Sequence, residues 1–364
     1  MSHDTIIPQP GILNITPYVA GKSAAKGGNR VTKLSSNENP LGPSPLAKAA
    51  YIEAAGALEV YPSSDHTNLR AAIAEVHGVK AERIICGAGS DEIISFLCNT
   101  YAGPGDEVLY SEFGFAMYPI SAMTAGATPV KAAETNLHAD VDALLAACTE
   151  RTKLVFLANP NNPTGTMIPE AEVTRLAEGI PAQALLVLDG AYAEFIEGFK
   201  GHAALVDARD NVVMTRTFSK IYGLGGARVG WGYGPAHVID ALNRVRGPFN
   251  VSAAALAAAE AAVQDTKYTA HCRAENAKWR AWLAEALTAI GLPSSESFTN
   301  FIVPHFPSAE AAAEADAYLQ TRGLVVRALN GYGMPEYLRI TIGDEIACRA
   351  VASTLTEFMK GARA

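Results

Sequence analysis

The stretch Thr215-Arg216-Thr217-Phe218-Ser219-Lys220, followed at a distance of eight residues by Arg228, decides the fold of this chain. The apolar run 212–214 precedes it and glycines follow it at 223, 225 and 226, a pattern that predicts a buried strand running into a glycine-rich turn. Lys220 then lies at the carboxyl end of a strand, where open α/β sheets bind ligands. Two hydroxyls and the Arg228 guanidinium surround its amine with anion-binding groups. The ordinary alternative is a solvent-exposed loop lysine, because most lysines are exposed.

Short apolar runs alternate with helix-like segments through the middle of the chain. Strands are predicted at 83–86, 107–110, 154–157, 185–188, 212–217 and 229–232. Between them, apolar residues recur at helical spacing over 91–101, and a second helix is expected to begin at Pro169. The alternation predicts a three-layer α/β/α fold, in which helices cover both faces of a mainly parallel sheet.

The pattern changes after Pro248. A single alanine-rich helix is predicted over 253–289, and a smaller α+β set follows it, with strands at 301–304, 324–327 and 338–342 and a last helix over 345–360 that Asp344 can cap. We therefore expect three parts: an N-terminal arm that joins the small domain (1–44), a large ligand-binding domain (45–250), and a linking helix with the small C-terminal domain (251–364).

The composition excludes several classes of protein. A chain of 364 residues with 49% hydrophobic and 18% charged residues can bury a large core. Its net charge of −8 and the lack of a basic run predict neither a nucleic-acid partner nor an anionic membrane partner. The start has no secretory pattern, and the apolar stretch 253–263 is too short to span a bilayer, so we expect a cytoplasmic protein. The five cysteines and eight histidines show no metal or disulfide spacing.

Polar residues follow two other predicted strands. Asn159-Pro160-Asn161-Asn162-Pro163-Thr164-Gly165 is a rigid turn that can present side-chain donors, and by itself it is only a turn. Asp189 ends a fully apolar run, with Tyr192 three residues later. A buried carboxylate is costly unless a cation neutralises it, and a protonated pyridine nitrogen is one such cation. A helix cap or a metal-binding aspartate is the alternative for Asp189.

The segment 87–92, Gly-Ala-Gly-Ser-Asp-Glu, joins a predicted strand to a predicted helix. Amides at the start of a helix bind phosphate. Glu92 stands where a dinucleotide fingerprint needs glycine, and the Gly-Lys-Ser/Thr of a P-loop is missing, so neither NAD nor ATP is expected. A phosphate cradle, an aldehyde-reactive lysine, an acid for a ring nitrogen and two donors to an oxygen, Asn162 and Tyr192, together describe a site for pyridoxal 5′-phosphate.

Five further motifs extend the pattern along nearly the whole chain. They are Ile15-Thr16-Pro17-Tyr18, the segment 34–44 (LSSNENPLGPS), Tyr61-Pro62 with Leu69-Arg70, Asn161-Asn162-Pro163-Thr164-Gly165, and Tyr337-Leu338-Arg339-Ile340-Thr341. With these motifs the chain resembles the fold-type I pyridoxal-phosphate aminotransferases, and most closely the histidinol-phosphate aminotransferases. The resemblance implies that the large domain binds pyridoxal phosphate and that two identical subunits form a homodimer with shared sites.

The resemblance also implies roles for individual residues. Lys220 is the Schiff-base lysine and proton shuttle, Asp189 pairs with the pyridine nitrogen, and Asn162 and Tyr192 bond the phenolic oxygen of the ring. The phosphate is held by the amides of Ser90, Asp91 and Glu92, by Thr217, Ser219 and Arg228, and by Tyr61 from the partner subunit. The substrate is bound by Tyr18, Asn39, Arg327 and Arg339.

One segment departs from the family pattern. The family commonly supplies the aromatic side chain that stacks on the cofactor ring from a Pro-Thr-Tyr sequence, whereas residues 111–118 here read Ser-Glu-Phe-Gly-Phe-Ala-Met-Tyr. The spacing to Tyr118 favours Phe115 as the stacking residue, and Phe113 is the fallback. Phenylalanine keeps the stacking face and lacks the hydroxyl.

The substrate is the least determined feature. Arg327 is an additional arginine that favours a phosphomonoester, and the resemblance implies amino transfer between L-histidinol phosphate and 2-oxoglutarate in histidine biosynthesis. Tyr18 and Tyr332 suit a phenyl or phenol ring equally, so an aromatic amino acid aminotransferase is the alternative. A fold-type I lyase or decarboxylase is a further enzyme alternative. A non-catalytic cofactor-binding regulatory module would need an appended DNA-binding segment, and the N-terminal arm contains no basic helix.

Overall fold

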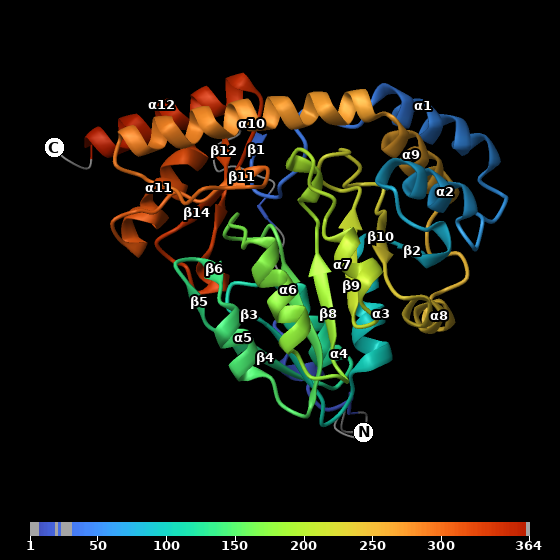
Figure 1. Ribbon diagram of the computed structural model, residues 1–364. Coiled ribbons are helices and arrows are strands. Elements are labelled where there is room, and N and C mark those ends of the chain that lie inside the picture. Colours follow the sequence, from blue (N-terminus) through green and yellow to red (C-terminus); the bar gives the residue numbers. More distant parts are fainter. Residues whose placement is uncertain (1–6, 19–20, 23–30, 362–364) are drawn as a thin grey trace, which may run out of the picture.

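A twisted seven-stranded sheet lies at the centre of the computed structural model, which describes residues 7–18, 21–22 and 31–361 (Figure 1). The strand order is β2-β10-β9-β8-β7-β3-β4. The strands are β2 (Ile84–Gly87), β3 (Glu107–Ser111), β4 (Thr128–Ala132), β7 (Thr152–Ala158), β8 (Leu185–Asp189), β9 (Val212–Thr217) and β10 (Gly230–Tyr233). β10 runs antiparallel to both of its neighbours and the other pairings are parallel, which confirms the prediction of a mainly parallel sheet.

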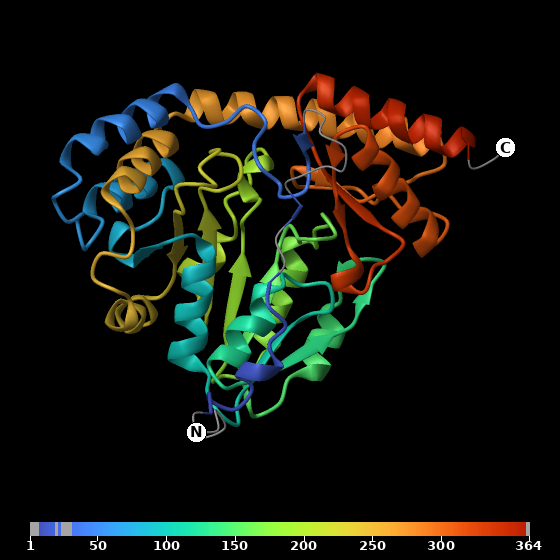
Figure 2. The same cartoon turned by 180° about the vertical axis from the view of Figure 1, so that it is seen from behind.

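Helices cover both faces of this sheet, because successive side chains of each strand point to opposite faces. On β8, Leu186 and Leu188 pack in one apolar cluster, and Leu185 and Val187 pack in another. The first cluster includes α2 (Thr67–His77), α5 (Val141–Ala147), α6 (Glu170–Gly179), α7 (Ala203–Ala208) and α9 (Ala253–Gln264). The second includes α3 (Ser90–Tyr101), α4 (Met117–Thr124) and α8 (Ala236–Val245). The architecture is therefore three-layered, α/β/α (Figures 1 and 2).

A separate apolar cluster forms the core of a smaller unit on one side of the sheet (Figure 1). Its three-stranded sheet has the order β11 (Phe301–Ile302), β14 (Leu338–Thr341), β13 (Arg327–Ala328). The helices α11 (Ala309–Thr321) and α12 (Glu345–Gly361) pack on it. β1 (Thr32–Lys33) pairs in parallel with β12 (Leu324–Val325), so the N-terminal arm contributes a strand to this unit. Asp344 caps α12, as predicted, by accepting a hydrogen bond from the Ala347 amide at 2.8 Å.

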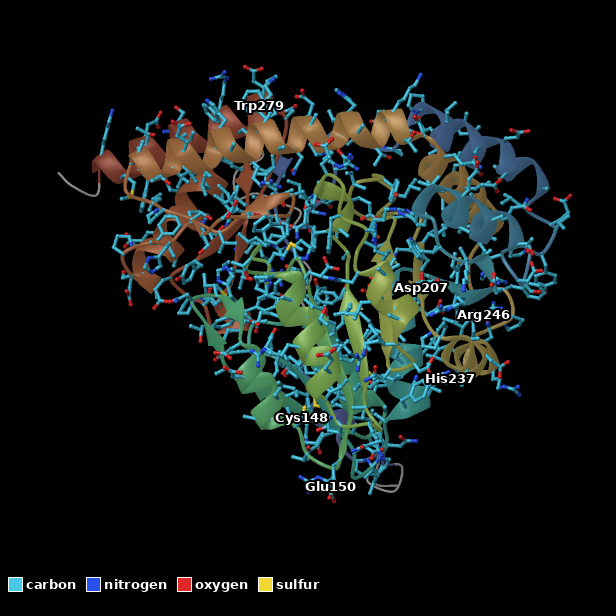
Figure 3. All side chains as sticks on the ribbon, in the orientation of Figure 1. Cys148, Glu150, Asp207, His237, Arg246 and Trp279 are labelled. Atoms are coloured by element: carbon cyan, nitrogen blue, oxygen red, sulfur yellow. The ribbon has the colours of Figure 1, made fainter. Side chains whose placement is uncertain are left out.

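The long helix α10 (Thr266–Ala289) connects the two units and runs along the top of the molecule in Figure 1, from the small unit to α9. Cys272, near its start, belongs to the core of the large unit, whereas Trp279, Leu283 and Leu287 belong to the core of the small unit. Figure 3 shows Trp279 in the middle of this helix. Because one rigid helix is anchored in both cores, the position of the small unit is tied to that of the large one.

Two predictions about the C-terminal part of the chain are wrong. The alanine-rich segment 253–289 forms two helices, α9 and α10, because the Asp265 side chain accepts a hydrogen bond from the Tyr268 amide at 3.1 Å and starts a new helix. Helix propensity alone cannot locate such a break. The segment 324–327 forms two short strands rather than one, since β12 pairs with β1 and β13 pairs with β14.

The edge strand β4 was not predicted. It is only partly buried and contains Pro129, and both features weaken the sequence pattern of a strand. The remaining elements are α1 (Pro45–Ala54), the hairpin β5 (Glu134–Thr135) and β6 (His138–Ala139), and short 3₁₀ helices at Ile12–Asn14, Ala55–Ala57, Ala81–Arg83, Ala193–Phe195 and Asn330–Tyr332. None of the helices in the described ranges is both long and apolar enough to cross a bilayer.

Candidate active site

A cavity of about 170 Å³ lies where the carboxyl ends of β7, β8 and β9 meet. The strand register sets Ala158 beside Asp189 and Asp189 beside Thr215, so the polar residues that follow these strands converge. The large unit lines the cavity with Ser90, Asp91, Phe115, Asn162, Asp189, Tyr192, Thr217, Ser219, Lys220 and Arg228. The arm contributes Tyr18 and Ser35 to Asn37, and the small unit contributes Arg327, Tyr332 and Arg339. The cavity therefore lies between the two units.

Lys220 follows β9 and points into this cavity. Its Nζ donates to the Ser36 carbonyl at 3.4 Å and lies 5.8 Å from the centre of the Tyr192 ring. Burial, and then the positive charge of Arg339, lower the pKa of Lys220 to about 8. A substantial fraction of its amine is therefore neutral near physiological pH, as a nucleophile or a base requires.

Asp189 is the last residue of β8 and is buried. Its Oδ2 accepts a hydrogen bond from the Tyr118 hydroxyl at 2.8 Å, and its Oδ1 accepts one from the Ala191 amide at 3.2 Å. Burial raises the pKa of this carboxyl group. Both donors are neutral, so a cation in the cavity would stabilise the carboxylate, and the protonated nitrogen of a pyridine ring fits this requirement.

Tyr192 and Asn162 lie on neighbouring parts of the wall. The Tyr192 hydroxyl accepts a hydrogen bond from the Asn37 side chain at 2.8 Å, and burial raises the pKa of Tyr192 to about 12, so the hydroxyl keeps its proton and can donate it to a ligand. The Asn162 side-chain oxygen accepts a hydrogen bond from Arg339, whose other terminal nitrogen donates to the Ser35 carbonyl at 3.0 Å. Arg339 is thereby fixed between the arm and the large unit.

The anion-binding groups gather at the start of α3. Arg228 donates to the Ser219 hydroxyl at 3.1 Å and forms an ion pair with Asp91 at 3.1 Å. The close approach depends on glycine: a Cβ atom on Gly89 would lie 2.4 Å from the Arg228 Nη2, and one on Gly230 would lie 2.3 Å from the Ser90 amide nitrogen. A helix start, hydroxyls and an arginine in this arrangement fit a phosphate group. Together with Lys220 and Asp189, the residues present fit pyridoxal 5′-phosphate.

Three predicted site residues do not line the cavity of their own chain: Glu92, predicted to act through its backbone amide; Asn39; and Tyr61, predicted to act in the site of the partner subunit. The Glu92 carboxylate accepts hydrogen bonds from the Ala88 amide at 2.7 Å and from Asn250 at 2.6 Å. Asn39 donates to the Ile221 carbonyl at 2.6 Å and to the Cys272 sulfur at 3.3 Å, and it lines two adjoining cavities instead. Tyr61 is 77% exposed and stacks on Phe249, with the ring centres 4.6 Å apart.

Of the two candidate stacking residues, Phe115 lines the cavity. Phe113 packs against the core of the large unit, and its carbonyl accepts a hydrogen bond from Asn161 at 3.3 Å. The geometry therefore favours Phe115 for contact with a ring bound beside Asp189.

Sequence reasoning missed several residues of the site. Tyr118 and Asn37 bond directly to Asp189 and Tyr192, and the carbonyls of Ser35 and Ser36 bond to Arg339 and Lys220. Asn37 stood in a family motif, and asparagine is one of the residues that adopt its left-handed backbone (φ 60°), but nothing in the sequence indicated Tyr192 as its partner. Within the described ranges, no group of three or more histidine, cysteine, aspartate or glutamate residues could hold a metal ion.

Comparisons with known proteins agree with this geometry. The family model for aminotransferase class I and II matches residues 29–355. A histidinol-phosphate aminotransferase of Ruegeria sp. (strain TM1040) is 67% identical over 98% of this chain and 99% of the relative, and one of Dinoroseobacter shibae is 61% identical over 97% and 98%.

Solved structures show the same fold. The crystal structure of histidinol-phosphate aminotransferase from Sinorhizobium meliloti in complex with pyridoxal-5′-phosphate has a TM-score of 0.87, with 28% identity over 92% of this chain and 93% of that chain. The structure of a histidinol-phosphate aminotransferase from Clostridium acetobutylicum has a TM-score of 0.83 at 23% identity, over 91% of this chain and 100% of that chain. The predicted fold class and the predicted resemblance are confirmed. The chain belongs to the aminotransferase class I and II family.

Proposed function

We propose that this protein is a pyridoxal 5′-phosphate-dependent aminotransferase that moves an amino group between L-histidinol phosphate and 2-oxoglutarate, in histidine biosynthesis. The observation that carries the proposal is that one cavity contains Lys220, Asp189 and an anion cradle together with two arginines of the small unit, Arg327 and Arg339. The names of the relatives at 67% and 61% identity support the same reaction.

Each residue of the large unit has a defined task in this reaction. When bound, pyridoxal phosphate would serve as an electron sink: its ring would delocalise the electron pair left on the substrate α-carbon when the bond to hydrogen breaks. Asp189 holds a proton on the ring nitrogen by its negative charge. Lys220, whose pKa is lowered to about 8, would act as the base that removes the proton from the substrate α-carbon and as the acid that returns it. Asn162 and Tyr192 donate to the phenolic oxygen of the ring.

The small unit and the arm supply substrate recognition. Arg339 is fixed by Asn162 and Ser35 and presents a planar guanidinium, which suits the two oxygens of a carboxylate or a phosphate. Arg327 adds a second positive charge to the same cavity, and this favours a phosphomonoester, which carries nearly two negative charges, over a monocarboxylate. Tyr18 and Tyr332 add aromatic surface that an imidazole ring can pack against.

We also propose that the protein acts in the cytoplasm as a homodimer with shared sites. An apolar surface on α1 and the residues after it supports the dimer, since Ile52, Leu58 and Tyr61 are at least 69% exposed. Exposed apolar patches of this kind mark protein interfaces. In the dimer, Tyr61 of one subunit would reach the phosphate in the site of the other.

The test compares two amino donors with 2-oxoglutarate as the acceptor. We expect turnover with L-histidinol phosphate, and kcat/KM lower by about 10²-fold or more with phenylalanine, because a carboxylate brings one negative charge to the two arginines where a phosphomonoester brings nearly two. Lys220→Ala should abolish turnover with both donors while the protein remains folded. Fast turnover with phenylalanine and none with histidinol phosphate would establish the aromatic aminotransferase instead. Release of ammonia or carbon dioxide without glutamate would establish a lyase or decarboxylase.

A further inference from the structure

Tyr118 lies directly behind the cavity wall and is completely buried. It is the second residue of α4, and its ring stacks on Phe156 of β7, with the ring centres 4.6 Å apart and the planes 11° apart. Its hydroxyl donates to Asp189 Oδ2 at 2.8 Å. The position of the Tyr118 phenol is therefore set by α4 and β7, and the phenol orients the carboxylate of Asp189 by a hydrogen bond.

The same side chain also contacts the aromatic residue on the cavity wall. The ring of Phe115 meets that of Tyr118 edge to face, with the centres 5.8 Å apart and the planes 88° apart. The Tyr118 amide donates to the Phe115 carbonyl at 3.0 Å. Tyr118 therefore links the carboxylate at the back of the cavity to the phenyl ring that lines it.

We infer that Tyr118 is a positioning residue for the reaction: its phenol fixes the Asp189 carboxylate against the ring nitrogen of the cofactor. This inference rests on the proposed function and assigns a role to a residue outside the cavity lining. Tyr118 occupies Oδ2 and the Ala191 amide occupies Oδ1, so the carboxylate is held at both oxygens. Each oxygen has a second lone-pair site, and one of them can accept the ring N–H.

The chemical nature of the donor matters as much as its position. A phenol is neutral, so it stabilises the charged carboxylate without cancelling the charge that the ring nitrogen needs. A lysine or arginine at this place would form an ion pair with Asp189 and compete with the pyridinium. A residue without a donor would leave a buried carboxylate oxygen with one hydrogen bond fewer, which favours the protonated acid. Tyrosine on α4 thus keeps Asp189 both charged and oriented.

The test measures binding of two cofactors to the apoprotein, with no amino substrate present. One is pyridoxal 5′-phosphate, and the other is its 1-deaza analogue, in which a C–H group replaces the ring nitrogen. Tyr118→Phe should weaken binding of pyridoxal phosphate about tenfold, because one hydrogen bond to a charged group is lost. Binding of the deaza analogue should change by less than about twofold, since the analogue has no N–H for Asp189 to accept.

Tyr110→Phe is the matched control. Tyr110 is buried in the same aromatic cluster, with its ring centre 6.3 Å from that of Tyr118, so the substitution removes a hydroxyl at a similar depth. We expect it to leave the affinity for both cofactors unchanged within about twofold. In turnover assays, Tyr118→Phe should lower kcat about tenfold and leave the KM for the amino donor nearly unchanged, as expected when ground-state binding of the donor is intact.

Two outcomes would overturn the inference. Equal loss of affinity for both cofactors would mean that Tyr118 only supports packing, and equal behaviour of the two Tyr→Phe variants would mean that its hydroxyl has no role. Should Tyr118→Phe fail to fold, Tyr118→His is the second variant: its imidazole N–H can replace the phenol as a donor, so it should bind pyridoxal phosphate within about threefold of the wild type, and an equal loss of about tenfold for both cofactors would overturn the inference. A wild-type protein that binds the cofactor and does not transaminate histidinol phosphate would contradict the proposed substrate and leave these binding results interpretable.

Discussion

At the scale of single residues, the site depends on two buried ionisable groups whose pKa values shift in opposite directions. Burial raises the pKa of Asp189 and lowers that of Lys220 to about 8, so both shifts bring the group toward its neutral form. A cationic ring nitrogen reverses this tendency at Asp189. The shift of the Lys220 pKa in the apoprotein has burial as its first cause and the nearby cation Arg339 as its second.

The lowered pKa of Lys220 predicts how stability depends on pH in the apoprotein. Below about pH 8 the amine is charged in both the folded and the unfolded state, so its burial is unfavourable. Between about pH 8 and the ordinary value of 10.5 the unfolded chain binds more protons, and the free energy of unfolding rises with pH. Lys220→Met should therefore be more stable than the wild type at pH 7, by about 1 to 3 kcal/mol.

Urea denaturation of the two apoproteins at pH 7 and pH 10 measures this difference. The difference in the free energy of unfolding between the two apoproteins should be smaller at pH 10 than at pH 7. A difference that stays constant or grows would contradict the lowered pKa of Lys220. Lys267→Met, at an exposed lysine of α10, is the control and should change stability by no more than about 0.5 kcal/mol at either pH.

For Asp189→Asn we expect a change in kcat rather than in stability. Asparagine keeps the shape of the side chain and removes the charge that holds the ring-nitrogen proton. We expect the variant to retain pyridoxal phosphate, as measured by its absorbance after gel filtration, and to lose about 10²-fold or more in kcat. A rate close to that of the wild type would show that the reaction does not need a protonated ring nitrogen.

At the scale of elements, the break between α9 and α10 decides how the two units are joined. α9 packs in the core of the large unit, and α10 continues into the core of the small unit. The cap at Asp265 supplies a partner for the Tyr268 amide at the start of α10. If 253–289 were one straight helix, its first part could not pack on α1 and α2 while its last part lies in the core of the small unit. The break allows both contacts.

Asp265→Ala should lower the free energy of unfolding by about 1 kcal/mol, because it leaves an amide at the start of α10 without its side-chain acceptor. Asp265→Ser is the matched control and should recover most of the loss, since serine also caps helices. Urea denaturation at a fixed protein concentration measures both variants. An alanine variant as stable as the serine variant would mean that the break does not depend on the cap.

At the scale of the whole molecule, the proposed shared site predicts complementation between two inactive variants. Tyr61→Ala removes the residue that would reach the phosphate of the partner, and Lys220→Ala removes the amine. When the two variants are mixed in equal amounts and allowed to exchange subunits, half of the dimers are mixed and each contains one intact site. We expect about a quarter of the wild-type activity.

Mixing must raise the activity above that of either variant alone. If the mixture is no more active than the separate variants although subunit exchange is demonstrated, each subunit would carry a complete site. Lys220→Ala mixed with Asp189→Asn is the control: one subunit supplies both Lys220 and Asp189 to its own site, so each site of a mixed dimer keeps one defect and mixing should restore nothing.

The sequence by itself predicted six of the seven strands of the central sheet, all except β4, and the polar residues that follow β8 and β9 at the cavity. Apolar runs specify buried strands, and the polar residues directly after them, Asp189 and Lys220, must lie at one edge of a parallel sheet. The signal is strong because strand, turn and site residue are close together in the chain. Residues 215–220 alone leave a solvent-exposed loop lysine as an alternative, and the site is indicated only when they are combined with Asp189, Tyr192 and the segment 87–92.

Only the tertiary structure decided which distant residues complete the site. Asn37, Tyr118 and Arg339 reach Tyr192, Asp189 and Asn162 across separations of 71 to 177 residues. Such contacts depend on the packing of α4, the arm and the small unit, and no local pattern records them. The side chains of Asn39 and Glu92 are likewise held by distant partners, Ile221 and Asn250, that no local pattern indicates. The position of Lys220 at the end of a strand can thus be predicted from the sequence. Its protonation state and its neighbours depend on burial and on packing, which only the fold decides.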